Sequence, residues 1–175
     1  MAVEMHFTEH DNVFVGEDKT FQFYVTTGLP IVVADSVENG DTTAEVHPLK
    51  ETIANGTKLR FGNQLITLSA EATVGATSIS FSAITGGIPA NSVGYAVVNV
   101  SGWTTTFIVY ATSGSTTALI TKSGSVGTAA NGVITATLAA ADTASMTPKR
   151  YHYKFRRTDS GYNAVLAYGD LWLKG

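Results

Sequence analysis

Hydrophobic and polar positions alternate along much of this chain. In the segment 20–26, Phe21, Phe23 and Val25 fall on one side of an extended backbone. A period of two residues is the pattern of a β-strand that buries one face. The same alternation, bounded by glycine, asparagine, aspartate and serine, predicts further strands in the segments 104–112, 116–124, 132–138, 149–157 and 162–175.

The segment 149–157 shows how such a strand would be oriented. Tyr151, Tyr153 and Phe155 are expected to point into a core, because alternate side chains of a strand share a face. The outward residues would then be Arg150, His152, Lys154 and Arg156. Of these, Arg150, Lys154 and Arg156 form a basic face together with Arg157, which either is solvated or meets an acidic partner.

Only one segment has a helical composition. Residues 138–146 are rich in alanine, and the Thr147-Pro148 step limits a helix there to about two turns. The remaining short strands and 17 glycines predict an all-β protein, most simply a β-sandwich. Trp103 and Trp172 lie in strand patterns, so we expect them in the core.

The pattern changes between Leu29 and Val100. A polar, turn-rich stretch leads into a hairpin across Gly62-Asn63, then into two strands, 77–82 and 94–98, around a glycine-rich loop. Four or five short strands bury little surface, so this segment is expected to lean on the parent sandwich or on a neighbouring molecule. We therefore predict an inserted β subdomain at 31–98 and a sandwich built from 1–30 and 99–175.

Composition restricts the classes of partner. The 175 residues are 44% hydrophobic and 14% charged, with a net charge of −3, so the chain should fold and has no electrostatic footprint for nucleic acid or an anionic membrane. No cysteine is present, which excludes disulfides and thiolate metal sites. The N-terminus lacks the pattern of a signal peptide, and no segment has 18 uninterrupted apolar residues, so we expect a soluble protein made without an export signal.

The stretch HFTEHD has the spacing of an inverted zinc-protease motif, with His6 and His10 as ligands and Glu9 as the base. That motif binds zinc only when a helix brings the two histidines to one face. Here the residues favour a strand, in which the histidines would lie about 13 Å apart. We expect no metal and no cofactor.

Other catalytic signals are weak. Glu17 and Asp18 are adjacent acids, but a turn before a strand explains them better than a carboxylate pair for glycoside hydrolysis. The glycine-rich stretch 123–132 joins two strands and opens no helix, so it reads as a hairpin loop. The chain has no nucleophile elbow, phosphate-binding loop or dinucleotide fingerprint, and we do not expect an enzyme.

Three segments resemble a known family in their order and spacing: VFVGEDKTFQFYV, VNVSGWTTTFIVYAT and GVITATLAAADTASMTPKRYHYKFRRTDSGYNAVLAYGDLWL. They are similar to the immunoglobulin-like β-sandwich of tailed-phage virion proteins, including the N-terminal domain of baseplate upper proteins. The inserted GTKLRFGNQLITLSAEATVGATSISFSAITGGIPA looks like a module of phage head-associated and decoration proteins.

This resemblance implies a structural virion protein, most simply a capsid decoration or head-associated protein assembled in the host cytoplasm. Its partners would be the major capsid protein or other virion subunits, and it would form a homo-oligomer, for example a trimer. The alternative is a tail, baseplate or fibre component in contact with host glycan, which would display clustered exposed aromatic side chains.

Two apolar groups are candidates for docking or self-association. They are Met5 and Phe7 near the N-terminus, and Ile84, Ile88 and Pro89 in the insert. Termini and loop tips are mobile unless something holds them, and these have more apolar side chains than solvent favours. The alternative is that both groups pack into their own chain.

Overall fold

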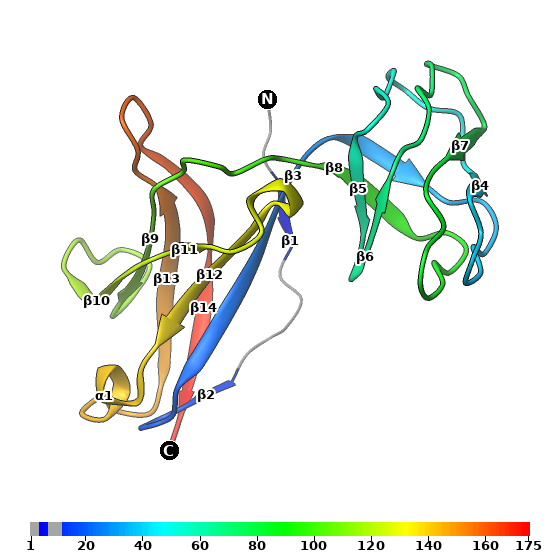
Figure 1. Ribbon diagram of the computed structural model, residues 1–175. Coiled ribbons are helices and arrows are strands. Elements are labelled where there is room, and N and C mark those ends of the chain that lie inside the picture. Colours follow the sequence, from blue (N-terminus) through cyan, green and yellow to red (C-terminus); the bar gives the residue numbers. More distant parts are fainter. Residues whose placement is uncertain (1–3, 7–11) are drawn as a thin grey trace. The chain divides into compact units, whose positions relative to one another are not determined.

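The structure is a computed structural model that describes residues 4–6 and 12–175 (Figure 1). Within these residues the chain divides into two compact units. The sandwich unit contains residues 4–6, 12–25 and 99–175, and the insert unit contains residues 26–98. The insert thus begins at Thr26, whereas the sequence predicted residue 31.

The sandwich unit has two sheets. One has the strand order β10-β9-β13-β14-β2, with bounds Ala118–Ser123, Thr105–Tyr110, Arg150–Arg157, Ala164–Lys174 and Asn12–Phe14. The other is formed by β11 (Ser125–Val126), β12 (Val133–Leu138) and the first part of β3 (Lys19–Val32). The short strand β1 (Glu4–His6) also pairs with β3.

Aromatic side chains fill the space between these two sheets. Phe23 of β3 stacks on Phe155 of β13 with ring centroids 4.1 Å apart, and Phe21 stacks on Phe107 of β9 at 5.1 Å. Phe107 also stacks on Tyr153, at 5.5 Å. The predicted inward sides of β3 and β13 are therefore confirmed, and the fold is an all-β sandwich. In the five-stranded sheet, β9, β13 and β14 are antiparallel neighbours, and β2 pairs in parallel with β14.

The one α-helix among the described residues, α1 (Ala140–Thr143), occupies the predicted helical segment and ends before Pro148. Asp142 accepts a hydrogen bond from the backbone N–H of Ala139 at 2.7 Å. Asp18 accepts a hydrogen bond from the N–H of Ala140 at 2.6 Å. This carboxylate, which is distant in sequence, therefore caps the N-terminus of α1. A 3-10 turn, η1 (Ala129–Asn131), lies in the predicted loop 123–132.

The insert unit contains the second part of β3 and five further strands: β4 (Thr43–Glu45), β5 (Lys58–Phe61), β6 (Gln64–Thr67), β7 (Ser78–Ser80) and β8 (Val93–Val97). The predicted hairpin across Gly62-Asn63 is present as β5 and β6. The strands β7 and β8 occupy the predicted segments, but they pair with β4 and with β5 and β3, not with each other.

An internal pseudo-twofold symmetry relates the two halves of the insert unit. Residue i in the first half corresponds to residue i + 35 in the second, as Thr43 of β4 does to Ser78 of β7. The strand pairings obey this rule except at residues 26–30, where a register shift pairs Ala96 with Thr27. The β5–β6 pair Leu59–Ile66 corresponds to the β8–β3 pair Gly94–Ile31.

Hydrogen bonds outside the strands follow the same offset. The bridge between Val37 and Ile88 corresponds to that between Ala72 and Ile53. Likewise, the bond from the N–H of Val46 to the Thr77 carbonyl, 2.8 Å, corresponds to that from Phe81 to Thr42, also 2.8 Å. The insert is therefore one structural unit built twice.

The insert unit has its own hydrophobic core. Most of its members come in pairs at the same offset, such as Leu49 with Ile84 and Ile53 with Ile88. The expectation that this segment must lean on another body for a core is therefore wrong, because the two halves bury their apolar side chains against each other.

Candidate functional site

The outer face of the five-stranded sheet holds the strongest candidate site in the described part of the chain. Cross-strand register aligns Arg150 with Trp172, His152 with Asp170, and Lys154 with Tyr168. All six side chains lie on the face opposite the aromatic core, because they alternate with the buried residues of β13 and β14.

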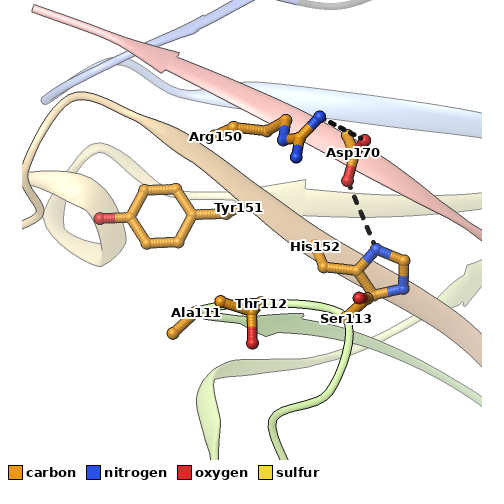
Figure 2. A pocket seen from close by; sticks show the side chains of 7 residues that line it. All are labelled: Ala111, Thr112, Ser113, Arg150, Tyr151, His152 and Asp170. Atoms are coloured by element: carbon orange, nitrogen blue, oxygen red, sulfur yellow. Dashed lines mark hydrogen bonds and ion pairs between the residues drawn. The ribbon is translucent and has the colours of Figure 1, made fainter.

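A pocket of about 140 Å³ lies beside these residues (Figure 2). We call it the Asp170 pocket. It is lined by Ala111, Thr112, Ser113, Arg150, Tyr151, His152 and Asp170. Residues 111–113 come from the segment after β9, and the others from β13 and β14.

Asp170 lies between the two basic side chains of the pocket, as Figure 2 shows. Its Oδ2 is 3.6 Å from Nη1 of Arg150, and its Oδ1 is 3.5 Å from Nδ1 of His152. Both distances exceed those of a good hydrogen bond, about 2.7–3.2 Å. The carboxylate therefore keeps most of its capacity to accept hydrogen bonds from another molecule.

His152 is only 8% exposed although it points outward, which differs from the solvated position expected for it. Its neighbours explain the burial: its ring centroid lies 6.1 Å from that of Tyr168, and it pairs in register with Tyr110. The ammonium of Lys154 in turn lies 5.2 Å from the Tyr110 ring centroid. Large side chains on both neighbouring strands thus cover the imidazole.

Two large aromatic side chains remain exposed beside the pocket. Tyr168 is 71% exposed and Trp172 is 55% exposed. The Arg150 guanidinium lies 6.0 Å from the Trp172 ring centroid, at the limit of a cation–π contact. The expectation that Trp172 lies in the core is wrong, because Leu171 and Leu173 take the inward positions of β14.

The other tryptophan belongs to a separate stack. Arg157 lies 4.0 Å from the ring centroid of Trp103 and 3.7 Å from that of Tyr162. It also donates to Asp159 through Nε at 2.8 Å and Nη2 at 2.6 Å. The hydrogen bond raises the pKa of Arg157 and lowers that of Asp159. Arg157 is therefore held in an internal ion pair and does not extend the basic outer face.

Serine, histidine and aspartate occur together in the Asp170 pocket, which raises the question of nucleophilic catalysis. No hydrogen bond joins Ser113 to His152 in the part of the chain that the structure describes, and the His152–Asp170 contact is long. In a catalytic triad both links are typically about 2.6–3.2 Å long, and they are often looser when no substrate is bound. The buried phenol of Tyr153 lies on the inner side of the sheet, where burial raises its pKa.

The predicted docking residues have different positions. Ile84 and Ile88 are 7% and 2% exposed and belong to the insert core, so the alternative in which they pack into their own chain holds for them. Pro89 is exposed. Met5 lies in β1, but its side chain falls outside the described residues, as does all of Phe7.

The zinc-like motif lies largely outside the described residues, which include neither Glu9 nor His10. Across residues 4–6 and 12–175, no group of three or more histidine, aspartate or glutamate side chains is arranged to hold a metal. The same residues contain no helix of the length and apolar character needed to cross a membrane.

The Asp170 pocket was not predicted from the sequence, although the alternation of residues in β14 pointed to it. The pattern of β14 alternates, so placing Leu171 and Leu173 inward puts Tyr168, Asp170 and Trp172 together on the outer face. The contribution of residues 111–113 has no comparable signal, because it depends on the path of a loop.

No family model matches the chain, and neither the curated proteins nor the solved structures include one that is detectably similar to it.

Proposed function

We propose that this protein is a structural component of a tailed-phage virion, specifically a capsid decoration or head-associated protein that binds the major capsid protein and stabilises the shell. The observation that carries the proposal is that two units, each with its own apolar core, are built along one strand, β3. Such a subunit can attach through one unit and present the other.

The resemblance of the sandwich segments to virion proteins gives this architecture its context. A non-catalytic role is favoured because the strongest polar cluster, around Asp170, lacks the short contacts of an acid–base pair. We therefore propose that the protein acts by binding alone. A single contact of roughly 800 Å² per partner need not be tight, but many copies on a repeating shell would multiply it through effective concentration.

Reconstitution with undecorated heads tests this proposal. Purified full-length protein is mixed with heads that lack accessory proteins, and the heads are then sedimented and heated. We expect the protein to co-sediment at a fixed number of copies per capsid subunit and to raise the temperature at which the shell opens. If the heads sediment while the protein stays in the supernatant, and the stability of the shell is unchanged, the proposal is contradicted.

A tail, baseplate or fibre component in contact with host glycan is the second candidate. The exposed pair Tyr168 and Trp172 favours it, because exposed aromatic side chains beside a polar pocket are the feature expected of a glycan binder. Mass spectrometry of separated heads and tails from one virion preparation distinguishes the two. Recovery in tails alone would replace the first candidate with the second.

A further inference from the structure

We propose that the Asp170 pocket binds one pyranose ring of a polysaccharide, with the sugar held between polar groups of the pocket and the exposed face of Trp172 or Tyr168. This inference goes beyond the first proposed function and deepens the second candidate, because it assigns a ligand class to one site, wherever in a virion the protein sits.

The size of the pocket limits the occupant. Its volume of about 140 Å³ is well below the roughly 300–1,000 Å³ of pockets for drug-sized ligands, so it cannot enclose a nucleotide or a peptide segment. It nevertheless exceeds the space of a single water, about 30 Å³ in the liquid, several times over. One small ring with polar substituents fits this range.

The polar groups of the pocket match a compound with neighbouring hydroxyl groups. Each hydroxyl is both a donor and an acceptor. Asp170 offers acceptors, Arg150 offers donors, and Thr112 and Ser113 offer hydroxyls that serve as either. The gaps of 3.5 and 3.6 Å on either side of the Asp170 carboxylate leave its oxygens available to ligand hydroxyls.

The charges argue against simple ions. A carboxylate and a guanidinium lie side by side in the pocket, so an anion would be repelled by Asp170 and a cation by Arg150. A purely apolar ligand would leave both charges desolvated and poorly paired, which is costly. A neutral polyhydroxylated ligand satisfies both groups without an unpaired charge.

The aromatic side chains account for the apolar part of a sugar. A pyranose ring has one face of C–H groups and a rim of hydroxyls, so it needs an apolar platform beside polar partners. Tyr168 and Trp172 provide such platforms, since both are more than half exposed and each contacts a residue that lines the pocket. Rigid aromatic surfaces of this kind bind at a low cost in conformational entropy.

Tryptophan fluorescence tests the assignment directly. The chain has two tryptophans, so the variant Trp103→Phe leaves Trp172 as the single reporter. This protein is titrated with a panel of methyl pyranosides of glucose, galactose, mannose and N-acetylglucosamine. We expect a saturable change in Trp172 emission with at least one of them, at a millimolar dissociation constant. The acyclic polyol sorbitol, at equal concentration, should produce no saturable change.

Variants identify the pocket as the source of that signal. Asp170→Ala and Arg150→Ala, in the same Trp103→Phe background, should each weaken the affinity at least tenfold. Tyr162→Ala removes an aromatic side chain that is also 55% exposed but belongs to the Arg157 stack, and it should leave the affinity unchanged. Far-ultraviolet circular dichroism verifies that each variant is folded. If one of the two pocket variants does not fold, the other still tests the pocket.

Three results would overturn the inference: no saturable response to any pyranoside, an equal response to sorbitol, or full affinity retained in a folded Asp170→Ala or Arg150→Ala protein. The test uses isolated protein, so its failure leaves head binding untouched. Conversely, a protein that fails to bind heads can still show the fluorescence response, which separates the two proposals.

Discussion

Gly94 of β8 lies directly opposite Phe61 of β5, and a Cβ atom on Gly94 would collide with the Phe61 ring. On the other side of the pseudo-twofold axis, Leu59 lies opposite Ala96. Equivalent residues of the two halves are 35 positions apart. Gly94 is therefore the counterpart of Leu59, and Ala96 is the counterpart of Phe61. Each pair thus combines one large and one small side chain.

This complementarity predicts the outcome of a double-mutant cycle. Gly94→Leu should destabilise the protein by about 1–3 kcal/mol or more through overpacking, and Phe61→Ala by about 3–5 kcal/mol through a cavity. The double variant creates a second Leu–Ala pair and should lose less stability than the sum of the losses of the two single variants, with a coupling of about 1 kcal/mol or more.

Urea unfolding measures the stability of all four proteins. Gly114→Ala, with open space around its Cβ, is the control and should be nearly neutral; strict additivity would refute the pairing.

Removing the insert should leave a folded sandwich. Thr26 and Val97 are paired in register, so their Cα atoms are about 5 Å apart and a short Gly/Ser bridge can replace residues 27–96. We expect the shortened protein to melt in one cooperative transition, because the stacked aromatic side chains between its sheets are unchanged. Calorimetry provides the measurement. A broad, non-cooperative transition would mean that the sandwich depends on the insert for its stability.

Asp142 should make stability depend on pH in the acid range. Its carboxylate accepts from Lys122, with Nζ and Oδ2 2.7 Å apart, and from the Ala139 N–H; these contacts lower the pKa of Asp142 below 3.8. A lowered folded-state pKa gives stability that is present above the unfolded pKa and lost as the pH falls through the folded one. Asp142→Asn should cost about 1 kcal/mol at pH 7 and progressively less below pH 4.

Urea unfolding at pH 7 and pH 3 provides that comparison. Asp35→Asn, at an exposed position, is the matched control and should have little effect at either pH. An Asp142→Asn protein with the same loss of stability at both values would rule out the contribution of ionised Asp142.

Arg157→Lys should loosen the hairpin that joins β13 to β14. A lysine ammonium cannot reproduce the fork of N–H donors that meets Asp159, nor lie flat between Trp103 and Tyr162. We expect faster hydrogen exchange of the Thr158 and Tyr162 amides, which bond to the Thr104 and Asp159 carbonyls at 2.8 Å. Lys154→Arg is a charge-conserving control; unchanged exchange in Arg157→Lys would exclude a role for the stack.

Zinc binding is not expected from the HFTEHD stretch, because the sequence favours a strand there, and in a strand His6 and His10 would lie about 13 Å apart. Titration calorimetry with zinc chloride should give no stoichiometric heat. Micromolar binding that disappears in His6→Ala would contradict this expectation.

Period-two alternation predicted the strands well where one face is fully buried. Phe21, Phe23 and Phe155 are inward as expected because the sandwich core demands it. Alternation alone did not say which side of β14 was inward, and Trp172 was assigned to the wrong one. Ile84 and Ile88 have no strand period, since they lie in loops closed by isolated bridges and single backbone hydrogen bonds.

The internal repeat escaped detection for a related reason. Identical residues occur at only four equivalent positions of the two halves, Ile31 and Ile66, Gly40 and Gly75, Thr42 and Thr77, and Ile53 and Ile88. The halves preserve backbone hydrogen bonds and buried positions, which many side chains satisfy. Such a likeness becomes visible only in three dimensions.

The symmetry of the insert also explains how it can be accommodated between two consecutive strands of a sandwich. The β5–β6 hairpin, closed by Gly62-Asn63, corresponds to the pairing of β8 with the end of β3. Under the same offset Val97 takes the place of Gly62, and Gly28 that of Asn63. The chain therefore enters and leaves the insert where its other half has a two-residue turn. The two ends of the insert therefore lie side by side, at the place that corresponds to the tight turn between β5 and β6.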